Sequence, residues 1–251
     1  MPAHAALVCI CFASGILSGV AGFGALIIMV PALLLMMGMD VIIPLSVLCG
    51  LATQSFNTFV FRRHIRKDSL GRLLLGSLPG IWLGSSLLLH MPEVALRAAM
   101  GVLLVCYVLW SVFGELPPPG SPPAAIWAYV AGFFCGAFGG AFGINGPPAV
   151  VYATRTNWSP QEIRAFLGVF CGTLFAVTAI TMLARGLIKP ETATLALLAI
   201  PSSLAGSYCG LRIAARMQAE QYRQLIFLLL FIMGCSLCWP GLRMLVASVS
   251  G

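Results

Sequence analysis

The fold is decided by the stretch Gly136-Ala137-Phe138-Gly139-Gly140-Ala141-Phe142-Gly143-Ile144-Asn145-Gly146-Pro147-Pro148, which lies inside an uncharged run from Leu116 to Thr154. A membrane-spanning helix needs about 20 apolar residues to cross about 30 Å of hydrocarbon. The run is too long for one straight helix and too short for two comfortable ones. Met1–Met39 is a second run of this length. Because glycine and proline weaken helix interiors, both runs predict interrupted helices.

The rest of the chain has the composition of a protein embedded in lipid. It is 60% hydrophobic and 8% charged over 251 residues, whereas soluble domains carry about 25% charged residues. The net charge of +7 comes from basic residues in short segments between apolar runs, which is typical of topology signals rather than of nucleic-acid binding. Six further uncharged runs fit one membrane crossing each: Val41–Phe61, Leu73–Pro92, Ala98–Gly114, Ala165–Ala184, Thr192–Leu211 and Gln224–Leu242.

The chain reads as two copies of one unit. Gly19-Val20-Ala21-Gly22-Phe23-Gly24 followed by Pro31 aligns with Gly136 to Ala141 followed by Pro148. Farther along, Pro79 and Gly84 match Pro201 and Gly206 at the same spacing. We therefore predict a first transmembrane repeat at 1–114, a proline-rich linker at 115–123 and a second repeat at 124–251.

Loop charge indicates how the two copies are oriented. The segment Arg62-Arg63-His64-Ile65-Arg66-Lys67 is the most basic and is placed in the cytoplasm. In the second copy the basic residues cluster at the other loop, at Arg212, Arg216 and Arg223. The predicted fold is an all-α polytopic membrane protein of two inverted repeats. Each repeat has a broken-helix hairpin plus three transmembrane helices.

The predicted hairpins are Ala5–Met37 and Ala124–Ala153, with breaks at Gly22-Phe23-Gly24 and at Gly139-Gly140-Ala141-Phe142-Gly143. A helix that starts after a break presents backbone N–H groups and a positive dipole end to the membrane centre, which suits an anion. The alternative is that these glycines only allow helices to pack closely. Their occurrence in matching positions of both copies favours a binding site.

Polar residues within the spans are the remaining candidates for a substrate-binding pocket. Asn145 beside the second break is the strongest, since Asn and Gln are costly in hydrocarbon without a partner. The alternative for threonine and serine is a hydrogen bond to their own helix backbone. The predicted substrate-binding residues are Gly22, Phe23, Gly24, Gln54, Asn57, Gly139, Gly140, Gly143, Asn145, Gly146 and Thr173. Thr53, Ser55, Thr58 and Thr178 are further polar residues of the same spans.

The residue types argue against catalysis. His4, His64 and His90 lie at span ends, and all seven acidic residues do so as well. No nucleophile–base pair, cofactor site or metal site is therefore expected, and coupling to a cation through a buried acid is disfavoured. The nine cysteines indicate apolar filler. A soft-metal path through Cys9 and Cys11, as in a copper permease or channel, stays open as an alternative.

These features resemble the sulfite exporter TauE/SafE family of membrane permeases. The resemblance rests on the two glycine-rich stretches and on Gly146-Pro147-Pro148-Ala149-Val150-Val151-Tyr152 with Trp158-Ser159-Pro160-Gln161-Glu162. It implies a permease of the bacterial inner membrane that exports sulfite, sulfonates or related organosulfur or organic anions. The expected partners are a small anionic substrate and the lipid bilayer, with no nucleic acid, and a homodimer is a further candidate.

Overall fold

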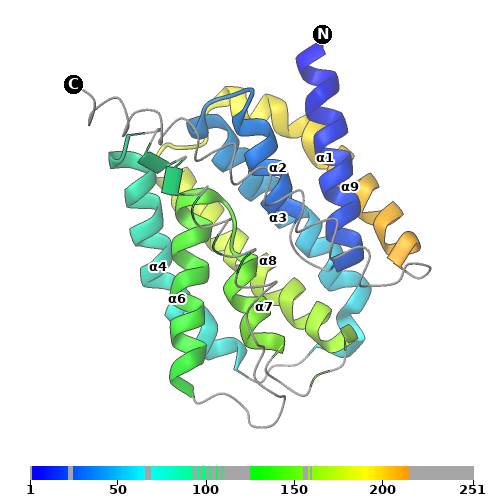
Figure 1. Ribbon diagram of the computed structural model, residues 1–251, viewed down its shortest axis with the longest axis vertical. Helices are drawn as coiled ribbons and strands as arrows, with labels where there is room; N and C mark the ends of the chain where they lie inside the picture. Colours follow the sequence, from blue (N-terminus) through cyan, green and yellow to red (C-terminus); the bar gives the residue numbers. More distant parts are fainter. Residues whose placement is uncertain are drawn as a thin grey trace.

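The computed structural model describes residues 2–21, 25–65, 69–92, 125–154, 158 and 160–214, with isolated positions between 95 and 109. Every regular element within these residues is helical, which confirms the predicted all-α class. The elements are α1 (Pro2–Ala21), α2 (Ala25–Leu34), α3 (Met39–Phe61), the 3₁₀ turn η1 (Arg62–His64), α4 (Leu70–His90), α6 (Ala125–Phe142), α7 (Gly146–Thr154), α8 (Pro160–Ala184) and α9 (Pro190–Ala214) (Figure 1).

Five helices of the described residues are long and apolar enough to cross a membrane. Four of them, α3, α4, α8 and α9, correspond to uncharged runs predicted to span, and the fifth is α6, the first arm of the second hairpin. The chain is therefore a multi-pass membrane protein. The other two predicted spans, Ala98–Gly114 and Gln224–Leu242, lie largely or wholly outside the described residues.

Helices α4 and α6 cross at their glycines. A Cβ on Gly80 of α4 would lie 2.2 Å from the carbonyl oxygen of Phe133 in α6. A Cβ on Gly136 of α6 would lie 2.2 Å from the carbonyl oxygen of Ser77. The two backbones therefore touch directly, as small residues allow between helices in membranes. Gly76, Gly84, Gly132 and Gly140 extend the contact by one turn each.

Helices α1 and α9 pack in the same manner. A Cβ on Gly15 would lie 2.2 Å from the carbonyl oxygen of Ser203, and one on Gly206 would lie 2.1 Å from that of Phe12. Gly210 meets Ile16 one turn farther along both helices, so α1 and α9 run in the same direction. Both crossings join a helix from residues 1–114 to one from residues 124–251.

Helices α3 and α8 lie against each other in opposite directions. Gly168 faces Thr58, Gly172 faces Gln54, and a Cβ on Gly50 would lie 2.7 Å from the ring of Phe175. Residue numbers thus rise along α8 as they fall along α3. This pair also contacts α4 and α9, which places it between the two glycine crossings (Figure 1).

The second break differs in position from the prediction. Helix α6 continues through Gly139 and Gly140 to Phe142, and the interruption is Gly143-Ile144-Asn145. Gly140 serves packing, because a Cβ there would lie 2.7 Å from the carbonyl oxygen of Ile81 in α4. A glycine in a helix held on a neighbouring backbone need not break that helix. The predicted break at Gly22-Phe23-Gly24 lies outside the described residues.

The two ends of the bundle differ in charge. Arg164 at the start of α8 lies 6.0 Å from the ring of Phe61, which brings it to the end that carries Arg62, Arg63 and Arg72. We call this the basic end. At the opposite end Lys189 pairs with Asp40, and this carboxylate raises the pKa of Lys189. The described acidic residues, Asp40, Glu162 and Glu191, all occupy first turns of helices, where the helix dipole favours them.

Candidate anion site at the α6–α7 interruption

The interruption is built by a glycine that ends α6. Gly143 has a φ of +69°, the left-handed region that L-residues with side chains rarely adopt. Its N–H donates to the carbonyl oxygen of Gly139 over 3.0 Å, which is a common way to end a helix. The chain then turns through Ile144 and Asn145 into α7, so the local sequence alone accounts for the break.

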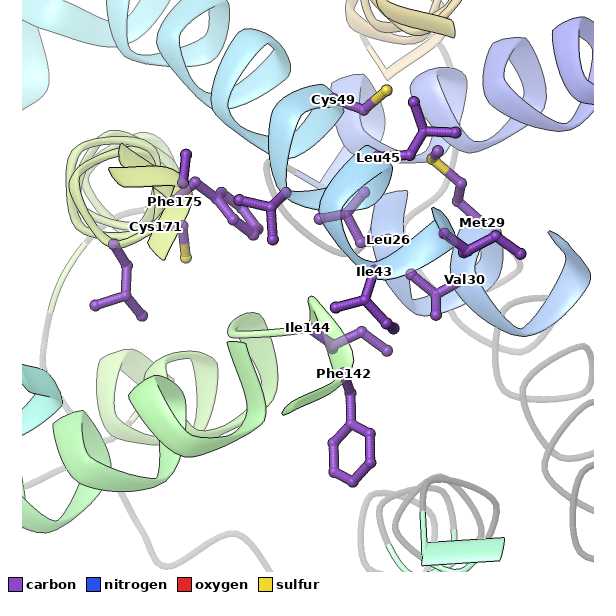
Figure 2. Packing of buried hydrophobic residues seen from close by; sticks show 14 of the residues in the cluster. Leu26, Met29, Val30, Ile43, Leu45, Cys49, Phe142, Ile144, Cys171 and Phe175 are labelled. Atoms are coloured by element: carbon purple, nitrogen blue, oxygen red, sulfur yellow. The ribbon is translucent and has the colours of Figure 1, made fainter. Parts of the chain in front are cut away.

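The interruption is fixed against α3. A Cβ on Gly143 would lie 2.1 Å from the Ser46 hydroxyl oxygen, and that hydroxyl donates to the carbonyl oxygen of Ile43 over 2.7 Å. Ile144 and Ile43 belong to one buried cluster, and Figure 2 shows them next to each other. The break therefore lies inside the protein, where irregular backbone is tolerated at membrane depth.

Asn145 places a polar donor in this buried region. Its side chain is 2% exposed, and its Nδ2 has no hydrogen-bond partner among the residues that the structure describes. Gly139 makes room for it, because a Cβ there would lie 3.2 Å from the Asn145 Cβ. An unpaired buried amide costs on the order of 1–3 kcal/mol. A ligand that accepts from this N–H group would recover that cost.

The start of α7 supplies fewer N–H groups than a helix start normally does. Pro147 and Pro148 have no backbone N–H, so in the first turn only Gly146 and Ala149 carry one. The backbone of Ala149 lies next to the Cys135 thiol. The helix dipole still favours a negative charge at this point, but side-chain donors must supply most of the hydrogen bonds.

Gln54 and Asn57 form a separate polar cluster. Asn57 Nδ2 donates to Gln54 Oε1 over 2.9 Å and to the Ser18 hydroxyl over 3.3 Å, while the Ser207 hydroxyl donates to Asn57 Oδ1 over 3.4 Å. The cluster ties α1, α3 and α9 together. Gln54 lies eight residues beyond Ser46 on α3, which is about 12 Å along the helix. The structure therefore does not bring these two residues to the interruption.

The other predicted site residues fall into four groups. Gly139, Gly143 and Gly146 lie at the interruption and are buried, whereas Gly140 faces α4. Thr173 is exposed, and its hydroxyl donates to the carbonyl oxygen of Val169 over 2.8 Å. Gly22, Phe23 and Gly24 lie outside the described residues.

Sequence reasoning missed Ser46, which contacts the interruption, and Ser18 and Ser207, which bind Asn57. The two serines are 39 and 150 residues away from Asn57 in the chain. Such pairs have no local sequence signal, because only the crossing of α1 and α9 over α3 brings them together.

The soft-metal path considered from the sequence runs through Cys9 and Cys11, and the two side chains lie in different environments. Cys9 is exposed on α1, whereas Cys11 is buried and lies near Cys49 of α3. Across the described part of the chain, no three His, Cys, Asp or Glu side chains are grouped closely enough to hold a metal ion.

Three comparisons with known proteins test which family the chain belongs to. Searches of curated proteins and of solved structures found no match. The family model for the sulfite exporter TauE/SafE matches residues 7–237, which is nearly the full length. The protein therefore belongs to the sulfite exporter TauE/SafE family of membrane transporters.

Proposed function

We propose that the protein is a permease of the bacterial inner membrane that exports sulfite, sulfonates or related organosulfur or organic anions. The anion binds at the α6–α7 interruption. One observation supports this most directly: Asn145 Nδ2, buried within the bundle, lacks a hydrogen-bond partner in the described part of the protein. A hydrogen-bond donor without an acceptor, at the positive end of a helix, favours the binding of a negatively charged ligand.

The arrangement of the helices supports two inverted repeats that move by alternating access. The α1–α9 and α4–α6 crossings use the same glycine-to-carbonyl contacts, and each joins one half of the chain to the other. Helices α3 and α8, at corresponding places in the two halves, run in opposite directions. These relations are those expected of inverted-topology repeats around a central substrate site.

The basic end supports the proposed orientation of the protein in the membrane. Cytoplasmic segments of membrane proteins carry an excess of Lys and Arg. Among the described residues, Arg62, Arg63, Arg72 and Arg164 gather at one end, while the other end holds Arg185 and the paired Lys189 and Asp40. Placed in the cytoplasm, the basic end would raise the local concentration of anions before export.

The test is flux of radiolabelled sulfite in proteoliposomes that contain the purified full-length protein. Asn145→Ala should lower the initial rate by about tenfold or more, since a hydrogen bond to an ion is worth about 1.5–3 kcal/mol. Asn145→Asp should lower it further through charge repulsion. Thr173→Val is the matched control and should transport like the wild type, because Thr173 is exposed and bonded to its own helix.

Sulfoacetate, thiosulfate and chloride tested in the same vesicles would define the range of substrates. Sulfite transport by Asn145→Ala at the wild-type rate would contradict the proposed site. Copper flux that is abolished by replacing Cys9 and Cys11, with no flux of any of these anions, would favour the soft-metal alternative.

A further inference from the structure

The hydroxyl groups of helix α8 are oriented in two different ways. Thr173 donates to the carbonyl oxygen of Val169 over 2.8 Å, and Thr181 donates to that of Val177 over 2.9 Å. This bond to the preceding turn is the usual arrangement for threonine in an apolar helix. Thr178 is fully buried, yet its Oγ1 makes no hydrogen bond to any residue that the structure describes. Its hydroxyl therefore lacks the bond to the preceding turn and keeps a donor to offer to a ligand.

Other buried hydroxyls show that this orientation is unusual in the protein. Ser14, Ser46, Thr53, Ser77 and Ser85 all donate to a carbonyl oxygen three or four residues earlier. Ser203 and Thr192 share the lack of a partner within the described residues, but they lie elsewhere. Ser203 lies beside Cys11 and Cys49, and Thr192 lies in the first turn of α9.

The contacts between α3 and α8 place Thr178 at the depth of the interruption. Phe175 meets Gly50 of α3, and Thr178 follows Phe175 by about one helical turn toward the end opposite the basic end. That turn corresponds to Ser46 and Val47 on α3, since the two helices run in opposite directions. Ser46 is the residue that Gly143 contacts.

The contact between α6 and α8 gives the same depth independently. The thiol of Cys171 in α8 lies near that of Cys135 in α6. Both helices run away from the basic end. Thr178 follows Cys171 by seven residues, and Phe142 follows Cys135 by seven residues. Phe142 is the last residue before the interruption. Figure 2 shows Cys171 and Phe175 of α8 on the side of α3 where Ile144 lies.

We propose that Thr178 is a substrate-binding residue of the α6–α7 site and determines its specificity for oxyanions. This inference rests on the proposed function. The hydroxyl of Thr178 and Nδ2 of Asn145 each donate to a different oxygen of one bound oxyanion. Two prolines reduce the backbone donors of α7, so a second side-chain donor is required there. A monoatomic anion such as chloride has no separate oxygens and gains less from two donors that approach from different helices.

The experiment measures sulfite and chloride transport by full-length variants in proteoliposomes. Thr178→Val removes the hydroxyl and nearly keeps the side-chain volume. It should raise KM for sulfite by about tenfold to about a hundredfold, the range expected for a lost hydrogen bond to an ion. Thr178→Ser keeps the donor and should stay within about threefold of the wild type. Thr181→Val is the matched control, because Thr181 bonds to its own helix, and it should leave KM unchanged.

Binding is measured in parallel as the rise in melting temperature that sulfite causes in the detergent-solubilised protein. If Thr178→Val does not fold, Thr178→Ala is compared with Thr178→Ser in the same way. A wild-type KM for sulfite in Thr178→Val, combined with impaired transport by Asn145→Ala, would overturn the role of Thr178 and leave the proposed function standing. Equal transport of sulfite by the wild type, Asn145→Ala and empty vesicles would overturn both.

Discussion

Asn57 and Asn145 are both buried inside an apolar bundle, but their surroundings differ. The carboxamide of Asn57 donates to Gln54 and Ser18 and accepts from Ser207. The carboxamide of Asn145 keeps a donor without a partner in the described structure. A satisfied polar group in a membrane protein holds helices together, whereas an unsatisfied one costs stability unless a ligand binds it. We infer that Asn57 stabilises the packing of the helices and that Asn145 binds the substrate.

The largest effect is expected from two neighbouring glycines with different contacts. Gly140→Ala would drive a Cβ to 2.7 Å from the backbone of α4, so the crossing must separate and the folded yield should fall severely. Gly139→Ala meets the Asn145 Cβ at 3.2 Å and should mainly displace that side chain. Size-exclusion profiles and sulfite flux would separate the two effects. Equal loss of folded protein in both variants would contradict the assignment of Gly140 to helix packing and of Gly139 to the binding site.

The next effect concerns the two asparagines directly. Asn57→Ala should lower the melting temperature, since it removes the hydrogen bonds that Asn57 makes with Ser18, Ser207 and Gln54, at a cost on the order of 1–3 kcal/mol. Asn145→Ala should leave the melting temperature unchanged or raise it, because it removes a buried donor that lacks a partner within the described residues. Thermal unfolding in detergent without substrate measures both. A large destabilisation by Asn145→Ala would mean that its carboxamide is structural after all.

The smallest effect is expected at the exposed ion pair of Asp40 and Lys189, whose side chains are 58% and 51% exposed. Asp40→Asn should lower the pKa of Lys189 toward its ordinary value and leave the melting temperature unchanged, because solvent screens exposed pairs. Thermal unfolding at low and at high salt would measure the change in melting temperature. A marked, salt-sensitive loss of stability would show that an exposed polar contact contributes as much to the free energy of unfolding as a buried one.

The sequence by itself determined the all-helical membrane class of the protein and the presence of a break in the second hairpin, although the predicted break covered Gly139 to Gly143 and the observed one covers Gly143 to Asn145. Charge-free runs set where helices can span, because lipid excludes charged residues over a fixed thickness. The break after Phe142 and the position of Asn145 follow from local chemistry, since a glycine in the left-handed region ends α6 and prolines begin α7.

Only the tertiary structure decided what each small or polar residue contacts. The sequence treated Gly139 and Gly140 alike, but one faces Asn145 and the other faces α4. It ranked exposed Thr173 above buried Thr178, and it could not show that Ser18 and Ser207 satisfy Asn57. The physical reason is that helix propensity and hydrophobic length are local, whereas hydrogen-bond satisfaction depends on which helices distant in the chain become neighbours.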